Sequence, residues 1–147
     1  MNLEITYDRT EKIYKWIDPT SGQILTAPAK QKQDLFRAAV AILDPDLADA
    51  AEHIIKEHPQ LERVTWRAVE LVAKDALEVF PAYRDGVAAM VDSSDEYGRY
   101  AIEATAHGLT CQCEHFQGMH APLTETGSRY CKHIIAYHLW LQVRAEW

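Results

Sequence analysis

Two short stretches decide the fold, and they contain every cysteine of the chain: Leu109-Thr110-Cys111-Gln112-Cys113 and Cys131-Lys132-His133-Ile134-Ile135-Ala136. An odd number of clustered cysteines is a poor framework for disulfides, which need pairs, and it favours a metal site. The residues Met1–Ile5 contain no basic segment followed by an apolar one. We therefore expect no secretory signal and an intracellular, cytoplasmic protein.

The spacing of these residues brings four metal-ligating side chains within reach of one ion. Cys111 and Cys113 end a predicted strand, and residues two apart in a strand point to the same face. Cys131 and His133 begin a predicted helix, where free backbone N–H groups and the helix dipole favour a thiolate. Three sulfurs and one imidazole are typical of closed tetrahedral zinc sites. We therefore predict one structural Zn²⁺ held by Cys111, Cys113, Cys131 and His133.

The fourth ligand has competitors, and the cysteines have a second interpretation. Buried cysteines often serve as small apolar side chains without any metal, but here all three occur in two paired signatures. His115, His120 and His138 are alternative imidazole ligands. We expect His115 and His120 in a solvated loop, and His138 on the inward stripe of the final helix as a core or ligand-supporting side chain. Four side-chain ligands would leave no open position for water, so the ion would hold the fold together.

The same residues resemble a SWIM zinc finger. Cys111-Gln112-Cys113-Glu114-His115-Phe116 is similar to the family's Cys-x-Cys-polar-x-aromatic stretch, although Glu114-His115 replaces the usual Pro-Asp. Cys131-Lys132-His133-Ile134-Ile135-Ala136 is close to its Cys-Lys-His-apolar-apolar-Ala helix start, and Tyr100 and Ile102 occupy the preceding strand. The resemblance covers residues 87–142, and the whole chain resembles small stand-alone SWIM proteins of bacteria and their mobile elements. It implies the ligands Cys111, Cys113, Cys131 and His133, and a module that contacts nucleic acid or partner proteins without being a catalyst.

The first half of the chain predicts a β-hairpin followed by three helices. Strand-forming residues at 13–17 and 23–26 flank a loop that contains proline, serine and glycine, which favours a hairpin. Apolar residues at helical spacing predict helices over 30–43, 45–57 and 61–80. The second of these helices has Asp44 as its N-cap and Pro45 as its first residue.

The second half predicts a small β-meander and a final helix. Alternating or apolar runs predict strands at 87–91, 99–104 and 109–113, before a long loop and a helix over 131–147. The expected fold is therefore α+β, in which the N-terminal hairpin and three-helix region pack with a C-terminal zinc-bound β-meander plus helix. We place the domain boundary at 81–86, which gives a region 1–86 and a zinc-binding module 87–147 in one compact body.

The charge of the chain disfavours nucleic acid as the main partner. Its 15 Lys+Arg and 22 Asp+Glu give a net charge of −7, and nucleic-acid binding depends on basic residues that neutralise phosphates. A local basic patch is the alternative. Its candidate residues, for nucleic-acid or partner binding, are Arg63, Trp66, Arg67, Lys74, Arg129 and Lys132. We favour a solvated face for the third helix because Glu70 and Lys74 form an i,i+4 pair.

The sequence motifs favour a binding protein over an enzyme. It contains no Gly-rich phosphate loop, no Gly-x-Ser-x-Gly, no His-Glu-x-x-His and no deaminase signature. No apolar run approaches the roughly 18 residues of a membrane span. We expect a non-enzymatic zinc-binding SWIM-type adaptor for protein–protein interaction, with DNA transactions as one setting, and neither a membrane nor a small-molecule substrate. The alternative is a direct nucleic-acid-binding protein that uses the local basic patch.

Overall fold

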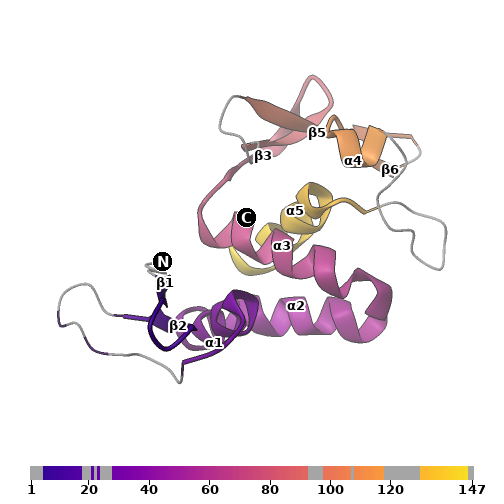
Figure 1. Ribbon diagram of the computed structural model, residues 1–147. Helices are drawn as coiled ribbons and strands as arrows, with labels where there is room; N and C mark the ends of the chain where they lie inside the picture. Colours follow the sequence, from indigo (N-terminus) through magenta and orange to yellow (C-terminus); the bar gives the residue numbers. More distant parts are fainter. Residues whose placement is uncertain are drawn as a thin grey trace. The chain divides into compact units, whose positions relative to one another are not determined.

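The computed structural model describes residues 5–17, 21, 23, 28–92, 98–106, 108–117 and 130–145. The chain divides into two compact units, Met1–Asp49 and Ala50–Trp147. The first holds a two-stranded sheet and the second a four-stranded antiparallel sheet, and helices accompany both (Figure 1). The fold is therefore α+β, as predicted. Among the residues described, no helix is both long enough and apolar enough to cross a membrane.

The N-terminal unit is a β-hairpin with a helix. Strands β1 (Ile5–Asp8) and β2 (Ile13–Trp16) pair antiparallel, with Ile5 opposite Trp16. The predicted partner of β2 was the segment 23–26, of which 24–26 lie outside the described residues; the described partner is β1. Helix α1 (Lys32–Leu43) follows, and Trp16, Leu35 and Ala39 form the buried core of this unit. Two backbone hydrogen bonds between Tyr14 and Ala29 and the ion pair of Lys15 with Asp8 add to this apolar packing.

Helix α2 (Pro45–Glu57) begins as the sequence predicts. The Leu47 N–H donates to the Asp44 Oδ1 at 3.3 Å, so Asp44 satisfies one of the free donors at the start of the helix. The helix ends before Pro59, where a short 3₁₀ helix, η1 (Pro59–Leu61), turns the chain into α3 (Glu62–Ala73). The α3 residues Val64, Ala68, Leu71 and Val72 are buried, as their spacing predicts.

The third helix is shorter than predicted: α3 ends at Ala73, whereas the sequence pattern predicts a helix that continues to Phe80. The Ala76 N–H donates to the Leu71 carbonyl and the Asp75 N–H to the Val72 carbonyl, while Asp75 takes a φ of 55°. This is a Schellman ending with aspartate at the left-handed position that glycine usually occupies. The chain then enters strand β3 (Leu77–Arg84), which tolerates Pro81 because it is an edge strand with an irregular register there.

The four-stranded sheet runs in the order β3-β4-β5-β6, and three of its strands match the predicted meander. These are β4 (Val87–Asp92), β5 (Arg99–Thr105) and β6 (Gly108–Cys111). The fourth, β3, joins β4 through Asp85-Gly86, two residues with positive φ, as a tight hairpin turn requires. The segment 81–86, where we place the boundary, therefore covers the end of β3 and the turn into β4.

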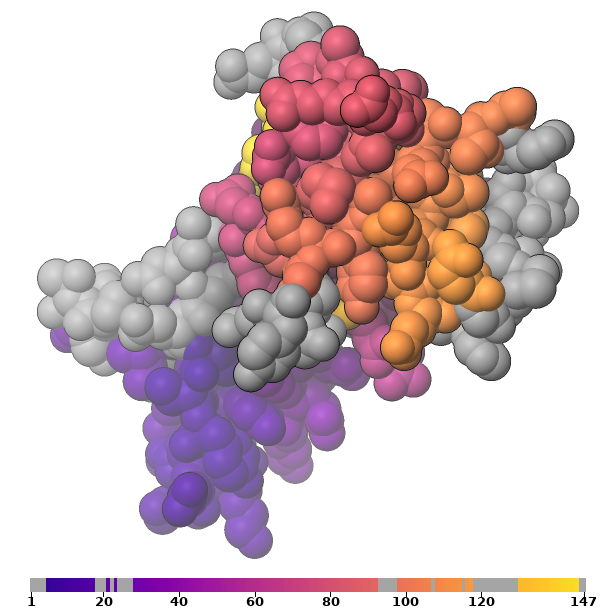
Figure 2. Space-filling view, turned by 90° about the horizontal axis from the view of Figure 1, so that it is seen from above, coloured from indigo at the N-terminus to yellow at the C-terminus, as the bar shows by residue number. Residues whose placement is uncertain are grey.

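Two further helices complete the C-terminal unit. The short α4 (Glu114–Gln117) follows β6, and α5 (Lys132–Val143) ends before the predicted 147. Helix α5 packs against α3 on one side and against β3 and β6 on the other, so it lies between α3 and the sheet (Figure 1). Figure 2 looks down on this unit from the sheet side, where the surfaces of the strands adjoin that of α4.

Candidate metal centre

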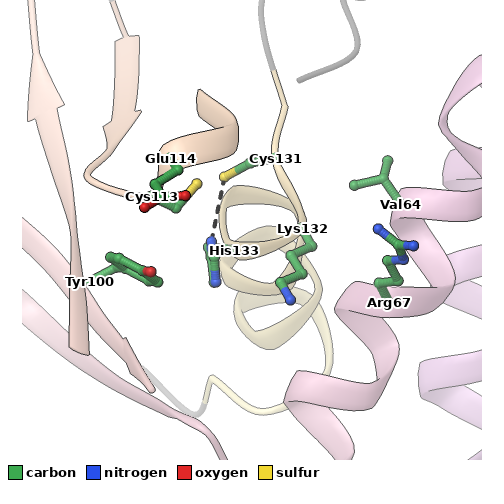
Figure 3. Close-up of a pocket in the computed structure, with 8 residues that line it drawn as sticks. All are labelled: Val64, Arg67, Tyr100, Cys113, Glu114, Cys131, Lys132 and His133. Atoms are coloured by element: carbon green, nitrogen blue, oxygen red, sulfur yellow. Dashed lines mark hydrogen bonds between the residues drawn. The ribbon is translucent and has the colours of Figure 1, made fainter. Parts of the chain in front are cut away.

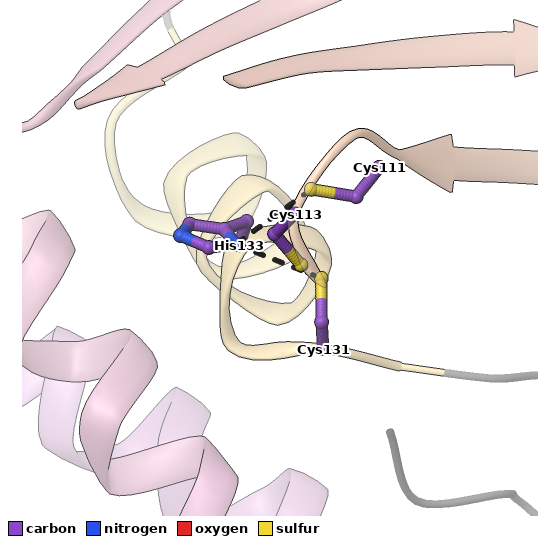
Figure 4. Close-up of side chains that lie close together, drawn as sticks. All are labelled: Cys111, Cys113, Cys131 and His133. Carbon is purple, nitrogen blue, oxygen red and sulfur yellow. Dashed lines mark hydrogen bonds between the residues drawn. The ribbon is translucent and has the colours of Figure 1, made fainter. Parts of the chain in front are cut away.

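Four buried side chains meet where β6, the following turn and the start of α5 come together. They are Cys111 at the end of β6, Cys113 in the turn after it, Cys131 as the N-cap of α5 and His133 in its first turn (Figure 4). Their ligand atoms all lie within 4.8 Å of one another. Each of the four residues is at most 3% exposed. These are the four ligands that the sequence predicts, and together they could hold a metal ion.

The separations fit an ion better than they fit hydrogen bonds. The Nδ1 of His133 lies 3.6 Å from the Cys111 Sγ and 3.8 Å from the Cys131 Sγ. Ligands about 2.3 Å and 2.0 Å from a tetrahedral zinc ion would place sulfur and nitrogen about 3.6 Å apart. Because Nδ1 faces two sulfurs, it is the nitrogen that would bind the ion.

Local backbone structure explains why the cysteines converge. Ile102 on β5 lies opposite Cys111 on β6, and the Gln117 Nε2 donates to the Cys111 carbonyl at 2.7 Å. After β6 the chain turns into α4, and the Phe116 N–H donates to the Cys113 Sγ at 3.4 Å. An N–H donated to sulfur stabilises a thiolate, so this turn supports Cys113 as a ligand.

When no ion is bound, the three thiols differ in the direction of their pKa shifts. Hydrogen bonds from Cys111 and Cys131 hold the pKa of the Cys113 thiol well below its usual range. Hydrogen bonds to Cys113 and Cys131, together with burial, raise the pKa of Cys111 far above its usual range. For Cys131, a hydrogen bond with Cys111 lowers the pKa, but its bond to Cys113 and its burial outweigh this and raise the pKa to about 11. The metal-free cluster thus favours one thiolate stabilised by two thiols.

The competing histidines do not join the cluster in the part of the chain that is described. His138 is exposed, so the prediction of a core or ligand-supporting role is wrong. Its ring packs between those of Tyr130 and Tyr137, and partial shielding from water lowers its pKa. The side chain of His115 and all of His120 lie outside the described residues. Helical periodicity placed His138 inward, but α5 is apolar nearly all round and has no single inward stripe.

The candidate binding residues fall into four groups. Arg63 on α3 and Lys74, which directly follows α3, are both exposed, and Lys74 pairs with Glu70 at 3.5 Å. Trp66 is only 8% exposed, so the aromatic member of the predicted local patch belongs to the core and cannot stack on a base. Arg67 and Lys132 line one pocket beside the cluster (Figure 3). Arg129 lies outside the described residues.

Two neighbours of the cluster were not anticipated as site residues. The ring of Tyr100 on β5 packs against the ring of His133, with centroids 5.1 Å apart. Glu114, at the start of α4, lines the pocket with Arg67 and Lys132. The predicted pairing of β5 with β6 could have pointed to Tyr100, because it places residues of β5 beside the cysteine at the end of β6.

Comparison of the chain with protein-family models, with curated proteins and with solved structures gives no significant match.

Proposed function

We propose that this protein is a non-enzymatic, zinc-binding adaptor of the SWIM type, in which one structural Zn²⁺ holds the C-terminal unit together for binding to a protein partner. The ligands are Cys111, Cys113, Cys131 and His133. Soft thiolates with one imidazole select zinc over magnesium or calcium, which prefer oxygen ligands. The SWIM assignment rests on the ligand pattern and on the helix start Cys131–Ala136.

The observation that carries the proposal is the burial of all four ligands, with their ligand atoms within 4.8 Å of one another. A catalytic zinc ion keeps one position open for water or substrate. Four side-chain ligands fill the shell of a tetrahedral ion, so zinc here would stabilise the fold and would not activate water.

A protein partner is favoured over nucleic acid by the surroundings of the basic residues. Lys74 is paired with Glu70, Trp66 is buried, and the chain carries a net charge of −7. Exposed apolar side chains are present in each unit, Ile42 and Leu43 on α1 and Tyr83 on β3. Such side chains are typical anchors of protein interfaces, whose binding depends little on salt.

Oligonucleotide titrations at two salt concentrations separate the two functions. For the zinc-loaded protein, we expect binding to a random duplex no tighter than about 10⁻⁵ M at physiological salt, with a shallow salt dependence. Single-stranded oligonucleotides serve as the second probe. Binding below about 10⁻⁷ M with a steep salt dependence would contradict the adaptor and favour direct nucleic-acid binding.

A pull-down from the native host, repeated after nuclease treatment, tests the protein partner itself. We expect a specific set of proteins to be captured by the zinc-loaded chain and to survive the nuclease. The matched control is the His133→Ala variant, which lacks one ligand. Loss of every captured protein after nuclease treatment would mean that nucleic acid bridges the contacts.

A further inference from the structure

A pocket of about 280 Å³ opens beside the metal cluster in the C-terminal unit. Helix α3 contributes Val64 and Arg67, the start of α5 contributes Lys132, and Tyr100 and Glu114 stand on β5 and α4. The ligands Cys113, Cys131 and His133 complete its lining. Figure 3 shows Lys132 and Arg67 on neighbouring helices to one side of His133, and Tyr100 on the other side.

The charges around the pocket suit a single negative group. Elsewhere in the described chain, Lys15, Lys74 and Arg99 each lie in an ion pair, but no ion pair of Arg67 or Lys132 occurs among the described residues. Glu114 opposes these two cations, and a zinc ion with three thiolates adds a further net negative charge. The formal charges of the lining then sum to about zero, so a ligand with a single negative charge adds the least excess charge beside Arg67 and Lys132. A carboxylate fits this balance better than a phosphate of higher charge.

A donor without an acceptor points to the same chemistry. The Nε2 of His133 is buried and has no hydrogen-bond partner among the described residues, although its ring lines the pocket. When Nδ1 binds a metal, Nε2 carries the proton and acts as a donor. Metal-bound histidines usually donate this proton to a carboxylate or a carbonyl, and an incoming carboxylate would supply that acceptor.

We propose that this pocket binds one carboxylate side chain of an acidic segment on a partner protein, with Arg67 and Lys132 as its cationic anchors. The planar guanidinium of Arg67 suits paired hydrogen bonds with a carboxylate. Lys132 lies between the ligands Cys131 and His133, so metal binding fixes its backbone and couples the pocket to the ion. Binding of the carboxylate and of the metal would then strengthen each other. This inference rests on the proposed zinc site and names the group that the adaptor would recognise.

The test is an NMR titration of the zinc-loaded full chain with N-acetyl-glutamate amide. Its matched control probe is N-acetyl-glutamine amide, which has the same shape without the charge. We expect saturable shifts of the Lys132 backbone amide, the Arg67 Nε–H and the His133 Nε2–H with the glutamate probe only. Arg67→Gln should weaken binding about tenfold, as expected for loss of a charge-assisted hydrogen bond. Arg63→Gln, one turn earlier on the same exposed side of α3, should change nothing.

Zinc content, measured on each variant, separates failure of this inference from failure of the zinc site. If Arg67→Gln keeps its zinc and loses the glutamate shifts, the pocket is supported. If the glutamine probe binds equally, or Arg63→Gln weakens binding as much as Arg67→Gln, the pocket assignment is wrong. Inorganic phosphate or a thymidine oligonucleotide that shifts the same resonances at lower concentration would assign the pocket to a nucleic-acid backbone and overturn the carboxylate. A chain that binds no zinc at all would instead contradict the proposed function.

Discussion

The two units of this chain are stabilised by different chemistry. In the N-terminal unit, Trp16, Leu35 and Ala39 form a small core of apolar side chains. In the C-terminal unit, apolar packing between α3 and α5 adjoins a buried cluster of three thiols and an imidazole. Apolar burial stabilises in proportion to the area removed from water. A ligand cluster stabilises fully only when an ion is bound, so the C-terminal unit alone should depend on metal.

Removal of the metal should have the largest effect, and it should affect one unit. Structural zinc contributes on the order of 10 kcal/mol to the folding of small metal modules. After chelation we expect hydrogen exchange to speed up strongly in β6 and the first turns of α5. The amides of α1 should stay protected, which makes the N-terminal unit an internal control. Equal protection of residues 100–140 with and without chelator would contradict this dependence.

Truncation of the largest core side chain in the other unit should produce the reverse pattern. Trp16 is 2% exposed, and Trp→Ala in a core typically costs 3–5 kcal/mol, a range we take as roughly the expected loss. Hydrogen exchange of Trp16→Ala should therefore show loss of protection in β2 and α1. Its zinc content should stay unchanged. The control Ile42→Ala, at an exposed position of α1, should alter stability by no more than about 0.5 kcal/mol. Loss of zinc from Trp16→Ala would mean that the two units are not independent.

The metal affinity of the C-terminal unit should depend on pH. The stability of the N-terminal unit should not show this pH dependence. The raised pKa values of Cys111 and Cys131 mean that both thiols are protonated in the metal-free chain near neutral pH. An ion must displace those protons, so the metal-free state binds more protons and affinity rises with pH. Each proton released corresponds to about a tenfold gain in affinity per pH unit below the thiol pKa. Competition with a chromophoric chelator at pH 6, 7 and 8 measures the metal affinity. An affinity independent of pH would show that no thiol loses a proton on binding.

The ligand cluster was predictable from the sequence because its information is local. Cys-x-Cys at a strand end and Cys-x-His at a helix start each orient two ligands within three residues. The N-cap Asp44 and the strands β4 to β6 were predictable for the same reason, since caps and alternation act over a few positions.

The sequence-based predictions differ from the structure where a sequence pattern was ambiguous, or where the structure depends on contacts between distant residues. Leu77, Val79 and Phe80 continue the apolar spacing of α3, and only the left-handed Asp75, without a glycine to mark it, ends the helix. The segment 81–86 was taken as a domain boundary, although Asp85-Gly86 within it is a strong hairpin signal. The pocket of Arg67 and Lys132 could not be predicted, because it depends on how α3 packs against α5.

X-ray absorption at the zinc edge tests the central claim most directly, namely that three sulfurs and one imidazole nitrogen form a closed shell. The account predicts three sulfur scatterers at about 2.3 Å and one nitrogen at about 2.0 Å. His133→Ala should lose the nitrogen or the zinc, while the control His138→Ala should give the wild-type spectrum. A wild-type shell with fewer than three sulfurs, or an unchanged spectrum for His133→Ala, would contradict it.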